Sequence, residues 1–215
     1  MRGPYRTPEP PLDDALPPPK DVGARRSSHP RMGARGAVAL LAGASAVVNL
    51  HEHGFVITGW FAKPAEILFD DVDAVYFDFE GLVPRPPQID LVTFDGRHAI
   101  LPRDLHDLDR VVAALEREVT RPVVARAKEA AARGEPLRFG PLGVEREGIV
   151  LHGKPLAWKD LRRVHAERDA FVFHAFGHDG RFGGVRLALV PHPRALLAVL
   201  RMHTKVVMKG LELPG

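Results

Sequence analysis

Paired histidines are the first residues in this chain whose spacing could carry chemistry. His51-Glu52-His53 places two imidazoles two residues apart, a fragment of the kind that can bind a transition metal. In a strand both rings would share one face and supply only two ligands, and no second ligand group follows at a matching spacing. A hairpin turn is therefore the favoured interpretation, and we expect no metal and no cofactor. His174 and His178 flank a predicted turn and are expected to be solvated.

Signatures of catalysis are missing from the sequence. It has no cysteine, which excludes disulfides, thiolate zinc sites and a cysteine nucleophile. It also has no G-x-S-x-G, no P-loop and no G-x-G-x-x-G that opens a helix. Asp71 and Asp160 recur in the two halves of the chain, but each follows an aromatic residue closely, which indicates a role at a strand end or bulge. We therefore do not expect an enzyme.

Basic residues are a candidate for anion binding. Four of them follow one predicted hairpin in the second half: Lys154, Lys159, Arg162 and Arg163. The corresponding part of the first half has Lys63 but also Asp70, Asp71 and Asp73, which would repel an anion. Binding of an anionic lipid head group is therefore confined to the second half, and a solvated basic face is the alternative.

The elements that must position these residues occur twice. Residues 54–59 (GFVITG) match 148–153 (GIVLHG) at an offset of 94, and residues 69–75 match 158–164 at an offset of 89. The difference of five residues is one longer loop in the first copy. The equivalent pairs are then Gly54 and Gly148, Phe69 and Trp158, Asp71 and Asp160, Leu101-Pro102 and Val190-Pro191, and Leu108 and Leu197.

Each copy is predicted to be a run of antiparallel strands closed by an amphipathic helix. A glycine turn, Gly54 or Gly148, precedes the second strand. Asp104 is the expected N-cap of the first closing helix. A linker helix follows over residues 120–133, with a break near Pro122 and Gly134 as its C-terminal stop.

These motifs resemble bacterial pleckstrin-homology-like (PH-like) domains. The similarity rests on Glu147-Gly148-Ile149, residues 156–161 with Val164, and Val190-Pro191 before the last helix. It covers residues 45 to 205 and is closest to an uncharacterised bacterial family with two such domains in tandem. A linker like residues 131–136 precedes the second copy in that family. His192 stands where the family often has asparagine, which implies a different helix cap.

The resemblance implies an α+β, mainly β fold of two tandem PH-like domains. Each would be an antiparallel β-sandwich or barrel capped by a C-terminal helix. The expected organisation is a disordered proline-rich tail (1–35), domain 1 (36–118), a helical linker (119–135), domain 2 (136–207) and a short tail (208–215). The start of the chain does not read as a secretory signal, and residues 36–50 are too short and too rich in small residues for a membrane helix, so a cytoplasmic protein is expected.

Charge divides the chain more sharply than the total of +3 suggests. Residues 37–118 carry 6 basic and 14 acidic residues, a net charge of −8. Residues 119–215 carry 17 basic and 9 acidic residues, a net charge of +8. Such halves should attract each other within one chain or head to tail between chains; the alternative is two independently solvated surfaces.

The sequence therefore favours a non-enzymatic protein or peptide interaction module, an adaptor or scaffold. Its expected binding grooves lie between a strand and a closing helix, beside residues 105–115 in the first copy and 195–203 in the second. The alternative is a peripheral membrane binder that recognises anionic lipids through the basic second copy. No nucleic acid partner is expected.

Overall fold

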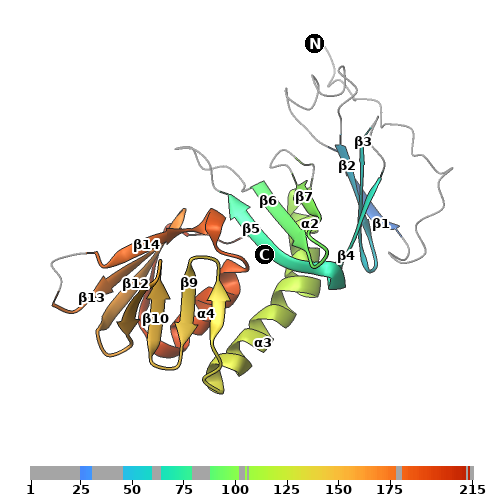
Figure 1. Ribbon diagram of the computed structural model, residues 1–215. Coiled ribbons are helices and arrows are strands. Elements are labelled where there is room, and N and C mark those ends of the chain that lie inside the picture. Colours follow the sequence, from blue (N-terminus) through green and yellow to red (C-terminus); the bar gives the residue numbers. More distant parts are fainter. Residues whose placement is uncertain are drawn as a thin grey trace, which may run out of the picture.

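Two repeats joined by one long helix make up the part of the chain that the structure describes (Figure 1). This structure is a computed structural model, and it describes residues 25–30, 46–59, 64–78, 88–101, 105, 107–177, 181–211 and 213, with only the backbone considered for 25–30, Ala46 and Gly59. The protein is mainly β, as the sequence predicted.

The first repeat consists of a four-stranded sheet, a three-stranded sheet and a helix. Its first sheet has the order β1-β2-β3-β4, and its second has the order β5-β6-β7. All pairs are antiparallel. The elements are β1 (Arg25–Pro30), β2 (Ala46–His51), β3 (Gly54–Gly59), β4 (Ala65–Leu68), the 3₁₀ turn η1 (Phe69–Asp71), β5 (Val72–Asp78), β6 (Gln88–Thr93), β7 (His98–Leu101) and α2 (Leu108–Leu115).

The second repeat has the same order of elements and one extra strand. Its sheets have the orders β11-β10-β9-β8 and β14-β13-β12-β15. The elements are β8 (Leu137–Phe139), β9 (Leu142–Glu145), β10 (Gly148–Leu151), β11 (Lys154–Ala157), β12 (Leu161–Glu167), β13 (Ala170–Ala175), β14 (Gly183–Arg186), the 3₁₀ turn η3 (Leu187–Leu189), α4 (Pro193–His203) and β15 (Val206–Lys209).

Strand register supports the duplication residue by residue. Gly54 pairs with Leu68, and Gly148 pairs with Ala157, which reproduces the offsets of 94 and 89. The β5–β6 and β12–β13 ladders each contain an irregularity, between Val72 and Ala74 and between Leu161 and Arg163, again 89 residues apart. The two halves therefore share their bulge as well as their strand order.

The predicted offset of 89 fails after the fifth strand of each repeat. Leu101 pairs with Ile89, and Val185 pairs with Phe171, so Val185 rather than Val190 is the counterpart of Leu101. Similarly, α2 begins at Leu108 and α4 at Pro193, so Leu108 does not match Leu197. The observed equivalent of Leu108 is Pro193, four residues before the predicted Leu197. Four residues are about one helical turn, and such a shift leaves the apolar stripe on the same face of the helix.

The beginning of α2 also differs from the prediction. Asp107, in the left-handed region with φ of 52°, is the N-cap, so the helix starts after Asp107 and not after Asp104. Asp104 and Pro102 lie outside the described residues. His192 is likewise the N-cap of α4 and lies in the left-handed region, with φ of 48°.

One uninterrupted helical segment connects the repeats. A π-helical turn over Glu116–Thr120 separates α2 from α3 (Arg121–Ala132), directly before Pro122. Proline has no backbone N–H to donate and its ring crowds the preceding turn, so a widened turn here is the expected response. At the other end Gly134 has φ of 75°, and the N–H groups of Gly134 and Glu135 donate to the carbonyls of Ala131 and Ala130. This is a Schellman motif, and it confirms Gly134 as the stop.

Two strands lie wholly or partly outside the ranges predicted for the domains. Strand β1 lies inside the segment predicted to be a disordered tail, since residues 25–30 pair with β2. Strand β15 crosses the predicted end of domain 2 at residue 207. In both places a neighbouring strand offers unpaired backbone groups, and backbone hydrogen bonding does not require an apolar sequence.

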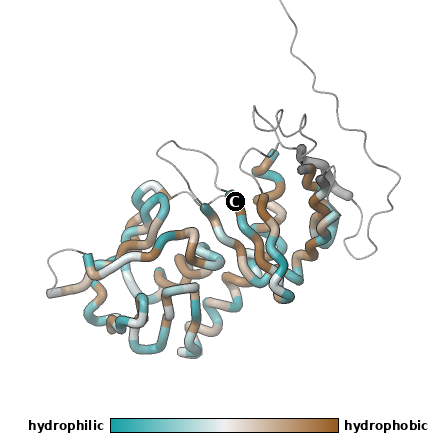
Figure 2. The backbone as a smooth tube through the Cα atoms, turned by 45° about the horizontal axis from the view of Figure 1, so that its top comes forward, coloured by the Kyte–Doolittle hydropathy of each residue, from teal (hydrophilic) through white to brown (hydrophobic). Residues whose placement is uncertain are grey.

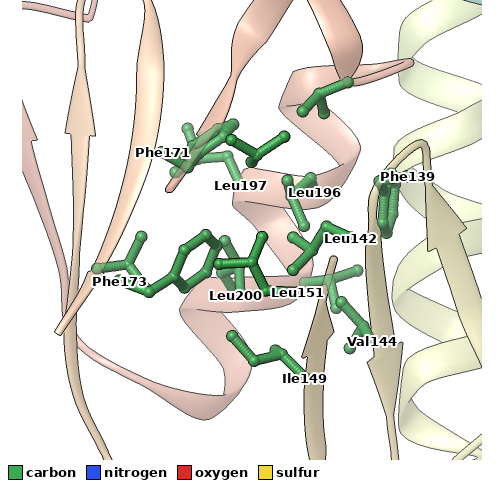
Figure 3. Close-up of a cluster of buried hydrophobic side chains, with 14 of the residues drawn as sticks. Phe139, Leu142, Val144, Ile149, Leu151, Phe171, Phe173, Leu196, Leu197 and Leu200 are labelled. Atoms are coloured by element: carbon green, nitrogen blue, oxygen red, sulfur yellow. The ribbon is translucent and has the colours of Figure 1, made fainter. Parts of the chain in front are cut away.

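Each repeat has its own hydrophobic core. Phe55, Ile89 and Leu91 are fully buried in the first core, and Phe171, Phe173 and Leu196 are fully buried in the second (Figure 3). Along the strands hydrophobic and hydrophilic residues alternate (Figure 2), which is typical of sheets with one face on a core. No helix in the described segments is both long enough and apolar enough to cross a membrane.

Candidate interaction surfaces

The histidine fragment does not form a ligand pair. His51 is buried at the end of β2, whereas His53 is exposed in the turn before β3. This agrees with the favoured hairpin-turn interpretation. Among the described residues no group of three or more potential ligands could hold a metal ion.

The four basic residues do not converge on one point. Lys154 opens β11 (Lys154–Ala157), whereas Lys159 lies in the turn that follows this strand. Arg162 is exposed on β12, but Arg163 is half-buried and its Nε is buried without a hydrogen-bond partner. Lys159 and Arg162 alone remain close in sequence and exposed.

Gly54 and Gly148 are needed for close strand pairing rather than for a turn. Both open a strand, and neither has a positive φ. A Cβ on Gly54 would lie 2.1 Å from the carbonyl oxygen of Ile67, and one on Gly148 would lie 2.2 Å from that of Leu156. The repeated glycine therefore marks the same cross-strand contact in each repeat.

Phe69 and Trp158 occupy the same backbone position but differ in surroundings. Their N–H groups donate to the carbonyls of His53 and Glu147, at 2.8 and 3.0 Å. Phe69 is buried, with its ring 5.3 Å from that of Phe55. Trp158 is half-buried and stacks on His203 at 4.3 Å. Burial lowers the pKa of His203, so the stacked ring is favoured in its neutral form.

Asp71 and Asp160 hold a second repeated feature that the sequence did not reveal. Their carbonyls accept hydrogen bonds from the N–H groups of Phe94 (3.0 Å) and Phe176 (2.8 Å). Both phenylalanines are among the exposed large apolar residues, with 71% and 59% of their surface accessible. The offset between them is 82, because the second repeat has a shorter connection before the sixth strand. Allowing for that shorter loop would have aligned them.

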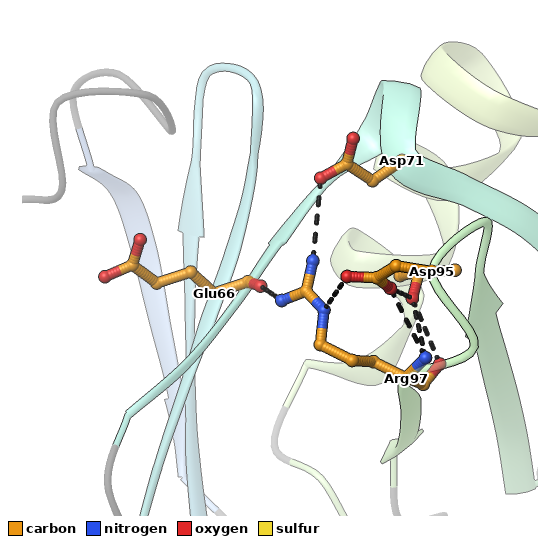
Figure 4. A network of polar contacts seen from close by, with 5 residues as sticks. Glu66, Asp71, Asp95 and Arg97 are labelled. Atoms are coloured by element: carbon orange, nitrogen blue, oxygen red, sulfur yellow. Dashed lines mark hydrogen bonds and ion pairs between the residues drawn. The ribbon is translucent and has the colours of Figure 1, made fainter.

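A polar network fixes the loop that carries Phe94 (Figure 4). The Arg97 guanidinium contacts Asp95 at 2.7 Å, Asp71 at 3.7 Å and the carbonyl of Glu66 at 2.8 Å. The Thr93 hydroxyl is hydrogen-bonded to Asp95. Hydrogen bonds from Thr93 and Arg97 lower the pKa of Asp95, so its carboxylate stays charged well into acid.

The two repeats meet at the outer edge of β5. The backbone N–H of His192 donates to the carbonyl of Val75 at 2.9 Å, and its Nε2 lies 2.7 Å from the carbonyl oxygen of Asp73. Since a carbonyl only accepts, Nε2 carries the proton and Nδ1 is left as a buried acceptor without a partner. Burial lowers the pKa of His192, and the contact with Asp73 opposes this only in part.

Arg194 adds a second link at this junction. Its Nη1 lies 3.3 Å from a carboxylate oxygen of Glu116 in the helix that closes the first repeat, and its Nη2 donates to the carbonyl of Leu213 at 2.7 Å. The side chain of Leu213 packs against both cores. The C-terminal segment is therefore tied to both repeats.

A shallow groove of about 570 Å³ lies beside this junction, between β5 and α3. Its lining includes Tyr76, Arg126, Arg133, Glu135 and His192. Arg133 and Glu135 pair with each other at 2.6 Å, so their charges largely cancel. Burial, and to a lesser extent Asp73, raises the pKa of Tyr76.

Strand β15 covers the equivalent edge in the second repeat. It runs parallel to β12, with Val164 opposite Val206 and Glu167 opposite Lys209. The N–H of Val164 also donates to the carbonyl of Lys205 at 3.0 Å. Beyond the strand Leu211 is buried in the second core. The chain's own C-terminal segment thus covers the β12 edge directly after α4.

On the outer face of the same sheet, two histidines contact each other. His174 Nε2 lies 3.1 Å from His165 Nδ1, so His174 is not the fully solvated residue that the sequence predicted. Burial lowers the pKa of His165, and the positive charge of Lys209 on β15 lowers it further. His178 lies outside the described residues.

The fold and these surfaces define a duplicated, mainly β protein in which the antiparallel strands of each repeat are followed by a helix. The chain belongs to DUF6585, a family of unknown function whose model matches residues 34–206. This agrees with the prediction of an uncharacterised family. Among curated proteins none matches the chain.

Proposed function

We propose that the protein is a non-enzymatic interaction module of two PH-like domains that binds an extended protein segment along a strand edge. The order of elements supports the PH-like assignment, because each repeat has a four-stranded sheet, an antiparallel three-stranded set and a closing helix. The observation that carries the binding function is β15, an extended segment already paired with the edge of β12.

The β12 edge has the two features that strand addition requires. Its outward backbone groups pair in parallel with β15, so another extended segment could pair there in place of β15, and backbone pairing supplies affinity without a particular sequence. Two residues after the end of β15, the second core provides a buried site for an apolar side chain, which Leu211 fills with 4% of its surface exposed. A partner segment would therefore be extended, parallel to β12, and carry an apolar residue a few positions after the paired stretch.

Side chains of β15 itself contribute little burial. Val206 and Val207 are half-buried, and Met208 and Lys209 are exposed. Most of the apolar burial in this segment rests on Leu211, so weakening that anchor should open the edge while the rest of the core remains. This gives a way to test the edge in the full chain.

The test uses a labelled peptide with the sequence of residues 205–213 and the full chain with Leu211→Asp. A charged side chain is costly to bury, so the variant's own segment should leave the edge and the peptide should bind there. The wild-type chain and a Lys209→Ala control, which keeps Leu211, should bind the peptide much more weakly. A folded Leu211→Asp chain with no affinity for the peptide would refute the proposal.

A second candidate function, binding to an anionic membrane, is favoured by one observation. Lys159 and Arg162 are exposed and lie within two residues of Asp160, whose carbonyl accepts a hydrogen bond from the N–H of the exposed Phe176. An aromatic side chain beside basic residues suits a membrane surface. Sedimentation with phosphatidylserine vesicles at low salt tests it, and replacing Lys154, Lys159, Arg162 and Arg163 should abolish the binding.

A further inference from the structure

Two exposed phenylalanines mark equivalent ends of the two repeats. We define the first tip as Asp70, Asp73 and Phe94, and the second tip as Lys159, Arg162 and Phe176. Each phenylalanine follows the last residue of a strand, Thr93 or Ala175, and each is held by the same backbone hydrogen bond. Single exposed apolar residues are common on proteins. A large aromatic at the same restrained position in both repeats, exposed both times, indicates a contact residue.

The charges around these phenylalanines are opposite in sign. Asp70 and Lys159 are 89 residues apart and equivalent, and both are exposed. Asp73 and Arg162 are also equivalent and exposed. Asp71 and Asp160 are common to both repeats, so they do not distinguish the tips. The duplication thus presents one backbone framework twice, once with acidic and once with basic side chains.

The two tips of one molecule do not meet. The strand β13, which leads to Phe176, ends at the far side of the second repeat from the first (Figure 1). The start of β5, which belongs to the first tip, lies by the linker helix (Figure 1). Complementary charge on separate parts of one molecule suits contact between molecules.

We infer that the first tip of one molecule binds the second tip of another copy of this chain. Lys159 and Arg162 face Asp70 and Asp73 in this contact, and the two phenylalanines are removed from water. Because the joined surfaces differ, the contact is heterologous, and repetition produces a head-to-tail chain or ring rather than a two-fold dimer. The inference is independent of the β12 edge, so either proposal can fail while the other holds.

Sedimentation equilibrium of the full chain over a range of concentrations tests this inference. The wild type should gain mass with concentration and lose that gain as salt rises. Asp70→Lys and Lys159→Asp should each weaken self-association by about tenfold or more, because each brings like charges together. Asp70 and Lys159 are both exposed, and circular dichroism verifies that the variants fold. Lys154→Asp, the same charge change on another exposed lysine, is the matched control and should behave as the wild type.

Mixing the two variants gives the sharpest result. Asp70→Lys places a basic residue at both equivalent positions, 70 and 159, and Lys159→Asp places an acidic residue at both, whereas an equimolar mixture restores opposite charges between these two positions at every contact. Association should therefore return in the mixture and weaken again with Phe94→Ser or Phe176→Ser. A wild-type chain that stays monomeric, or variants that fail to restore association on mixing, would overturn the inference. Phe176-dependent binding to phosphatidylserine vesicles without self-association would also overturn it, in favour of a membrane.

Discussion

His192 donates its backbone N–H to Val75, and Val164, the equivalent of Val75, pairs with β15. The same strand edge is therefore covered in both repeats, once by the N-cap of the following repeat's helix and once by the C-terminal strand. An uncovered edge is a template for unwanted pairing. The linker helix explains the difference, since the chain after α2 continues as helix and cannot return as a strand.

Acid should destabilise the protein partly through His192. Its pKa in the fold is lowered from about 6.5, so the unfolded state takes up a proton first as pH falls. The contribution of neutral His192 to the free energy of unfolding is then fully present above about pH 6.5. It is lost as the pH falls from there through the pKa of His192 in the folded state. His192→Asn tolerates the positive φ and should show a smaller loss of unfolding free energy between about pH 7.5 and about pH 5.5, measured with urea.

The remaining slope in that variant is expected from His165 and His203, whose pKa values are also lowered by burial. His192→Ala serves as a control that loses the side-chain contact and the tolerance of the left-handed conformation, and it should be less stable at both pH values. A wild-type pH slope in His192→Asn would contradict the assignment.

Alanine at either repeated glycine should destabilise its own repeat. The added Cβ would contact backbone atoms, which cannot move as a flexible side chain can. We expect Gly54→Ala and Gly148→Ala each to cost about 1–3 kcal/mol in urea unfolding. Unchanged stability in both variants would show that the strands can separate there without cost.

Leu211 should anchor the C-terminal segment. The side chain is 4% exposed in the second core, so Leu211→Ala should cost about 2–5 kcal/mol and speed the exchange of the β15 amides. Leu189→Ala is the matched control, because Leu189 is 50% exposed and its replacement should have little effect. Equal effects of the two substitutions would speak against the anchor.

Glu116 and Arg194 should be energetically coupled. Both side chains are largely buried, at 15% and 26% exposed, and their charged atoms lie 3.3 Å apart. A double-mutant cycle with Glu116→Gln and Arg194→Met should give a coupling free energy of about 0.5–3 kcal/mol. Additive effects would mean that this ion pair contributes no coupling free energy.

The sequence predicted the architecture where local patterns and tertiary contacts agree. Gly54 and Gly148, Phe69 and Trp158, and the stop at Gly134 lie in short segments of fixed length, so their register survives in both repeats. The junction depends instead on contacts between distant residues. His192 and Asp73 are 119 positions apart, and no local pattern connects them.

Errors of alignment arose where loop lengths differ. The connection between the fifth and sixth strands is seven residues shorter in the second repeat, which hid the match of Phe94 with Phe176. A shift of about one turn in the closing helix leaves its apolar stripe on the same face, so the apolar pattern alone could not reveal the shift. Strand β1 was missed because its pairing with β2 is made by backbone groups, which any residue except proline supplies in full.

The helical segment from Leu108 to Ala132 contributes Val119 to the first core and Ala127 to the second. Unfolding of either repeat on its own would have to fray a helix that the other repeat still holds. Heat or denaturant should therefore melt both halves in a single cooperative transition. For the same reason neither half is a separable unit, and excising one by cutting within this segment should leave the other with an incomplete core.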